Sequence, residues 1–177
     1  MSAIVDMVQA HLSGDGMAQL AQHLGTDQNS AQTAMAAALP MLLGAMAHTA
    51  SQPGGAAVLH EETDKHAAGS RAPAPAPTSG GGLLERILGG KQENVRQEVS
   101  KTSGLDMHQA EKALLFLAPI VMTQLARKQQ EGALAPEQLG TVLHQERQAA
   151  QEQAQQQAPH LTGALGSALG RILGWKS

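Results

Sequence analysis

The sequence of 177 residues contains no cysteine and no tyrosine, and only one phenylalanine and one tryptophan. Without cysteine the chain can form neither disulfide bonds nor thiolate zinc sites, and it has no thiol nucleophile. Stretches rich in Val, Ile, Thr and aromatic residues, which are typical of β-strands, are also missing. The apolar residues are mostly Ala, Leu and Met, which favour helices. The composition therefore predicts an all-α protein.

Charge and long apolar runs are scarce as well. The 12 Lys and Arg residues against 15 Asp and Glu give a formal net charge of -3, which provides no general attraction to a nucleic-acid backbone. No uninterrupted apolar run approaches the roughly 18 residues of a membrane span. The first residues, MSAIVDMVQAHL, lack the basic region and the cleavage site of a signal peptide. We therefore expect a cytoplasmic protein.

An internal repeat is present instead. The two halves align without gaps at a shift of 79 residues, and the match includes a glycine, an aspartate and a proline, which chance pairs of alanines do not explain. The three pairs are Gly25 and Gly104, Asp27 and Asp106, and Pro40 and Pro119. The sequence thus predicts two tandem helical-bundle repeats, at residues 1–66 and 83–147.

Each repeat predicts the same local structure. A short apolar helix leads to a second helix, which the glycine closes in a left-handed conformation. The aspartate then caps a long amphipathic helix by accepting hydrogen bonds from its first amides. The expected short helices span residues 2–12 and 15–24 in the first repeat, and 82–89 and 91–103 in the second.

Pro40 and Pro119 interrupt the predicted long helices, because proline lacks the amide hydrogen and clashes with the carbonyl four residues back. We expect a kink or a restart at each proline, with free carbonyls at Ala36 and Leu115. Those carbonyls would either accept a hydrogen bond from a ligand or accompany a simple bend of the helix around its core.

Three segments complete the predicted domain organisation. Residues 67–82 alternate Pro and Ala between Gly and Ser residues, which predicts a semi-rigid linker. Residues 148–159 are rich in Gln and predict a polar, solvated helix extension with almost no apolar stripe. Residues 160–177 predict a Gly-rich amphipathic helix at the C-terminus.

In this C-terminal segment, leucines and an isoleucine form one apolar stripe, and glycines recur at intervals of four. The glycine spacing permits close approach between helices, which favours self-association. A tryptophan at the end of an amphipathic stretch favours a membrane surface instead, and docking on the protein's own core would fit the pattern equally well. The residues assigned to self-association or membrane contact are Leu165, Gly166, Leu169, Gly170, Ile172, Gly174 and Trp175.

A local cluster of potential metal ligands comprises His60, Glu61, Glu62, Asp64 and His66. The two histidines are six positions apart, so they lack the i, i+4 spacing of helical zinc ligands. The cluster would either hold a metal or consist of solvated and capping residues, and we favour the second interpretation. The sequence contains no phosphate-binding loop and no nucleophile elbow. We expect no catalytic residue, no cofactor and no small-molecule substrate.

The helix–glycine–helix arrangement resembles the skeleton of a helix-turn-helix. A helix that reads a DNA groove normally lies among basic residues, which neutralise phosphates. The corresponding segment of the first repeat, QNSAQTAMAAAL, contains no Lys or Arg, and that of the second contains only Lys112. We therefore interpret the arrangement as a packing motif and rank nucleic-acid binding below the other functions.

The segment LGTDQNSAQTAMAAALPMLLGAMA combines Gly-x-Asp, spaced alanines and a proline inside the helix. In these features it is similar to the bacterial "domain of unknown function 937" family and its YidB-like relatives. The resemblance covers residues about 1–150 in two copies, and the Gly-rich tail also looks like the tails common in that family. It implies an all-helical bacterial protein and supplies no activity, substrate or cofactor.

These features lead to the hypothesis of a non-enzymatic interaction or assembly protein, whose partner is another protein or a second copy of the chain. The motivating observation is that Ala- and Gly-lined helices can pack closely. The alternative is peripheral association with a membrane or the cell envelope through the tail, and DNA binding ranks third.

Overall fold

The computed structural model describes residues 3–69, 80–132 and 134–173. These residues form nine α-helices and contain no β-strand, which confirms the predicted all-α fold. The first four helices are α1 (Ala3–Leu12), α2 (Asp15–Leu24), α3 (Gln28–Ser51) and α4 (Gly55–Gly69). They are followed by α5 (Gly80–Leu88), α6 (Gln92–Ser103), α7 (Met107–Gln130), the short 3-10 helix η2 (Pro136–Gln138), α8 (Leu139–Gln157), the 3-10 helix η3 (Pro159–Leu161) and α9 (Thr162–Leu173).

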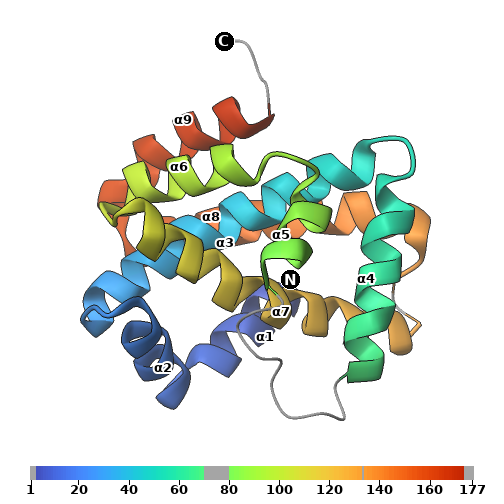
Figure 1. Cartoon of the computed structure of the whole chain (residues 1–177), viewed down its shortest axis with the longest axis horizontal. Helices are drawn as coiled ribbons and strands as arrows, with labels where there is room; N and C mark the ends of the chain where they lie inside the picture. Colours follow the sequence, from blue (N-terminus) through green and yellow to red (C-terminus); the bar gives the residue numbers. More distant parts are fainter. Residues whose placement is uncertain (1–2, 70–79, 133, 174–177) are drawn as a thin grey trace.

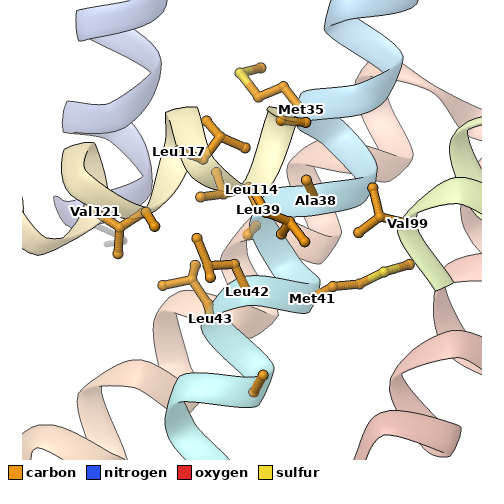
Figure 2. Packing of buried hydrophobic residues seen from close by; sticks show 14 of the residues in the cluster. Met35, Ala38, Leu39, Met41, Leu42, Leu43, Val99, Leu114, Leu117 and Val121 are labelled. Atoms are coloured by element: carbon orange, nitrogen blue, oxygen red, sulfur yellow. The ribbon is translucent and has the colours of Figure 1, made fainter. Parts of the chain in front are cut away.

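Helix α3 lies at the centre of the molecule, and the other helices surround it (Figure 1). Every residue from Ala34 to Ala47 is buried, on all sides of the helix. Figure 2 shows its Leu and Met side chains between those of α6 and α7, with Val99 on one side and Leu114 on the other. Its alanines let neighbouring backbones approach, and α8 makes the most extensive contact with it. Because no face of α3 is polar, it needs partners all around.

The helices of residues 1–66 and 83–147 interleave in one core instead of forming two separate bundles. Helix α1 packs on α7 and α8 packs on α3, while α4 and α5 each contact both α3 and α7. The buried apolar side chains of the described residues, from Ile4 to Ile172, form a single cluster. This arrangement follows from α3, since the short helices beside it in the sequence are too few to enclose it.

The glycines and aspartates at the helix ends adopt the capping conformations that the sequence predicts. Gly25 and Gly104 end α2 and α6 in the left-handed conformation, with φ of 70° and 75°. Asp27 then caps α3 by accepting a hydrogen bond from the Ser30 amide at 2.9 Å. Asp106 caps α7 in a capping box with Gln109. These caps satisfy amides that the first turn of a helix cannot satisfy itself.

The two prolines lie inside continuous helices. Pro40 is within α3 and Pro119 within α7, and both helices continue past them, so neither restarts there as the sequence had allowed. Pro40 is itself buried, so the neighbouring helices hold α3 together across the missing hydrogen bond. In α7 the hydroxyl of Thr123 donates to the Pro119 carbonyl at 2.8 Å.

Two predicted segment boundaries need correction. The linker is shorter than residues 67–82, because α4 continues to Gly69 and α5 begins at Gly80; the intervening part lies outside the described residues. The Gln-rich segment 148–159 is helical to Gln157, as expected, but it is no solvated extension. Its alanines at positions 150, 154 and 158 are buried. Small side chains at this spacing form a packing stripe of low hydrophobicity, which a search for large apolar residues misses.

Helix α3 is also the one described helix that is long and apolar enough to cross a bilayer, with a mean hydropathy of 1.3. Of its most apolar window, 78% is buried inside the protein, which is typical of a core helix. Length and composition alone are therefore weak evidence for a membrane segment here. No long uninterrupted apolar run marks this helix in the sequence, because polar residues near its ends and Gly44 interrupt it.

A buried carboxylate joins the two ends of the fold. Glu146 of α8 is 3% exposed and accepts hydrogen bonds from the amides of Ile4 and Val5, at 3.1 and 3.0 Å. Its other oxygen lies 3.7 Å from the amino group of Lys128. The carboxylate thus caps the first turn of α1, where free amides and the helix dipole favour negative charge.

We expect Glu146→Ala to lower the free energy of unfolding by about 3 kcal/mol, because it leaves two amides and a lysine without their buried partner. Urea denaturation followed by circular dichroism measures this loss. Glu152→Ala is the control, since Glu152 is exposed on the same helix; it should change stability by no more than about 0.5 kcal/mol. Equal losses in the two variants would contradict the capping role.

The cap at Asp27 makes stability depend on pH. Hydrogen bonds from the Ser30 amide and hydroxyl lower the pKa of Asp27 below its ordinary value of 3.8. Because the folded pKa is lower than the unfolded one, the cap stabilises fully above pH 3.8, and this is lost as pH falls through the folded value. The stability difference between the wild type and Asp27→Asn should therefore shrink in acid, as measured by urea titrations at several pH values. A difference that grows in acid would have the wrong sign.

Candidate interaction site

The C-terminal helix α9 lies on a surface formed by α3 and α6, which we call the seat (Figure 1, α9 in red beside α6). Its inner face carries the predicted apolar stripe, and these side chains are buried against the chain's own helices. They are Leu165, Ala168, Leu169 and Ile172. Of the three arrangements compatible with the tail sequence, the described structure has the one in which the helix docks on its own core.

A missing side chain makes room in the seat. At Gly44 of α3, an added Cβ would lie 3.0 Å from Cδ of Arg147 and 3.1 Å from Cδ2 of Leu169. Glycine therefore allows side chains of α8 and α9 to meet over the backbone of α3. Burial at this junction lowers the pKa of Arg147. The sequence did not single out Gly44, because the repeat pairs it with Thr123 and no turn marks it.

Two polar contacts fasten α9 to the seat. Glu98 of α6 has a side chain only 7% exposed, and it accepts hydrogen bonds from Nε and Nη2 of Arg171 at 3.0 and 2.7 Å. These bonds raise the pKa of Arg171. Lys91 donates to the carbonyl of Ile172, in the last turn of α9, where free carbonyls favour a cation. The Arg171 side chain is 60% exposed, so solvent screens part of the attraction.

The glycines of α9 face away from the seat. Gly163 and Gly166 are exposed, and a Cβ added at either one, or at Gly170, would meet nothing within 4 Å. These residues therefore make no close helix contact within the chain. Gly174 and Trp175, also assigned to a contact, lie outside the described residues.

The residues of the histidine cluster lie in different surroundings in the structure. His60 and Asp64 line an open groove of about 370 Å³ between α4, α7 and η2, together with Gln129. The Nδ1 atom of His60 lies 2.9 Å from the Gln129 amide nitrogen and 3.7 Å from Asp64. His66 has its Nδ1 atom 2.9 Å from the carbonyl of Glu62, in the preceding turn. Among the described residues, no three potential ligands are close enough to hold a metal ion.

Glu62 of the same cluster belongs to the core. It is buried and pairs with Lys65 on its own helix and with Arg86 of α5. Burial would raise the pKa of Glu62, but these two cations outweigh it and hold the pKa below its ordinary value. The carboxylate thus links α4 to α5. Its role in joining helices was not evident from its spacing to the histidines.

The fold defines an all-α protein in which one long apolar helix is enclosed by the others. Residues 6–128 match the family described as "Bacterial protein of unknown function (DUF937)", and the chain belongs to this family. The family matches this stretch once, so the comparison gives no evidence for two tandem copies and no match out to residue 150. No curated protein and no solved structure matches the chain significantly. Helices α3 and α6 lie inside the matched stretch and α9 lies outside it.

We expect Gly44→Leu to loosen α9, because its side chain would overlap those of Arg147 and Leu169. Hydrogen exchange measured by mass spectrometry should become faster over residues 162–173 and change little in α2. Gly166→Ala is the matched control, since it fills open space and gains about 1 kcal/mol of helix propensity. It should slow exchange in α9. Unchanged exchange in Gly44→Leu would show that the glycine does not make the seat.

Proposed function

We propose that the protein is a non-catalytic helical module that binds an amphipathic helix, from another protein or from a second copy, on the seat formed by α3 and α6. One observation carries this proposal. Helices α3 and α6 lie inside the stretch that matches the family, and they bind α9, which lies outside it. The anchors of α9 lie at spacings of three, four and seven residues, as in helices bound in a groove. A cytoplasmic location is part of the proposal.

The polar contacts also support a binding role. The buried Glu98 carboxylate has Lys101 of its own helix at 3.5 Å, and it needs a closer cation to offset the cost of its burial. This requirement selects a helix with a cation after its last apolar anchors, as Arg171 stands in α9. A seat with both apolar and charged requirements discriminates between helices better than an apolar groove alone.

We further propose that the chain arose by internal duplication. Helices α3 and α7 both have 24 residues and both begin after a capping aspartate. Glu62 of α4 and Glu146 of α8 are both buried, and each contacts the first helix of the other half, at Arg86 and at Ile4. These parallels support two copies whose helices interleave in one core. The features of the seat itself differ between the halves.

The binding proposal is tested with a chain that ends at residue 159 and a labelled peptide of residues 160–177. We expect fluorescence anisotropy to show saturable binding, because the truncation uncovers the seat. A peptide with Arg171→Glu should bind about 5-fold more weakly, since it places a second negative charge beside Glu98. The full-length chain is the control and should bind little peptide while its own α9 is docked. Equal binding by both peptides, or none by the wild-type peptide to a folded truncated chain, would contradict the proposal.

A further inference from the structure

We propose that the outer face of α7 docks an acidic amphipathic helix from another protein. This face, which we call the α7 stripe, comprises Leu115, Phe116, Pro119, Ile120 and Thr123. The proposal goes beyond the seat and does not depend on it, because α9 stays docked while the stripe is used.

The stripe is an apolar surface that the described helices leave partly open. Its residues are one, three and four positions apart, so they share one side of α7, and all five are half-buried, whereas the inner side is buried. At one edge the ring of Phe116 lies 5.6 Å from that of His23 in α2. At the other edge Glu111 pairs with Arg96 of α6 at 3.0 Å. The neighbouring helices therefore pack along the edges and leave the middle facing solvent.

The corresponding face of α3 is covered by helices. The positions 79 residues earlier in the chain are all buried, and they are Ala36, Ala37, Pro40, Met41 and Gly44. Side chains of Arg147 in α8 and Leu169 in α9 lie over Gly44. None of the described helices covers the α7 stripe in this way. The comparison of the two long helices therefore indicates that a helix is the kind of element that fits this face.

The residue types of the stripe suit contact with a protein. Phe116 is the one phenylalanine of the chain, and Leu115 and Ile120 lie beside it. Aromatic side chains surrounded by apolar neighbours contribute much of the binding energy at protein interfaces. A partner helix would place apolar residues at intervals of three, four and seven over these side chains.

The charges at the two ends of the stripe define the partner further. Lys112 and Arg127 lie on the same side of α7, and neither side chain has a hydrogen bond or ion pair with a described residue. They are 15 positions apart, which is about 22 Å along the helix. The corresponding residues of α3, Thr33 and His48, include no Lys or Arg. A helix that bears a carboxylate at each end of its apolar face complements both cations.

The same charges disfavour a second copy as the occupant. If two α7 helices packed antiparallel about the middle of the stripe, Lys112 of each copy would approach Arg127 of the other. If they packed in parallel, each cation would approach its own counterpart. Like charges that face each other act against both arrangements, so the acidic helix comes from another protein.

The test selects binders from a library of helical peptides of about 18 residues, which is long enough to reach both cations. One face of each peptide is apolar, and the two positions at its ends vary among Glu, Gln and Lys. Selection uses the full-length chain, and peptides that also bind Phe116→Glu are removed. We expect the retained peptides to carry Glu at both end positions. A retained peptide should slow hydrogen exchange over residues 112–127 and leave residues 162–173 unchanged.

Fluorescence anisotropy then measures the binding of one retained peptide to variants of the chain. Lys112→Glu and Arg127→Glu should each bind about 5-fold more weakly, since each reverses a cation that has no partner within the described residues. These two variants change surface charges and keep the test decisive if Phe116→Glu unfolds, which circular dichroism detects. Val58→Glu is the matched control, because Val58 is a 39% exposed apolar residue on α4; it should bind as the wild type does.

Several results would overturn the proposal. They are a selection that yields no binder, ends that carry Gln or Lys as often as Glu, and equal binding by both charge variants and the wild type. Slower exchange over residues 162–173 in place of 112–127 would move the binding to the seat and overturns it too. So does a wild-type mass of twice 18.3 kDa in light scattering that Lys112→Glu changes, because a second copy would then occupy the stripe.

Discussion

The enclosure of α3 is the constraint on which the rest of the structure depends. From Ala34 to Ala47 this helix is buried on every side, and alanines between its Leu and Met side chains leave its backbone open to close approach. Such a helix is stable only when other backbones come close all around it. Helix α8 packs along α3, and α6 and α7 approach it from other directions (Figure 2). Helix α9 covers the remaining surface of α3. Docking of the last helix is thus part of completing the core.

Three buried glutamates set which helices lie together. Glu62 joins α4 to α5, Glu98 joins α6 to α9, and Glu146 joins α8 to the start of α1. Taking a carboxylate out of water is costly, so a buried ion pair is weak evidence for stability. Its effect is greater on specificity: Glu62 and Glu98 each keep a lysine of their own helix, but a displaced helix would lose the partner on the neighbouring one. In a core of small and similar side chains, which permits sliding between helices, these charges fix the positions that apolar packing leaves loosely defined.

The sequence correctly predicted the helix boundaries that local capping and turn residues determine. Helix α2 occupies residues 15–24 as expected, since Gly25 ends it and Asp27 begins the next helix. It did not predict the contact between Glu146 and Ile4, which joins residues more than 140 positions apart. It also missed the burial of Ala150, because a stripe of alanines adds little hydrophobicity. Which helix encloses which is decided by packing over distances that no local pattern records.

The seat is the clearest example of packing that local sequence patterns did not predict. The glycines of the tail predicted a contact face, yet they lie outside and the leucines lie inside. The residue that does permit close approach is Gly44, in the helix below. Glycine on the outer face has a different consequence, since it lowers the helix propensity of α9 without weakening its contacts. The helix therefore owes its structure to the surface that holds it.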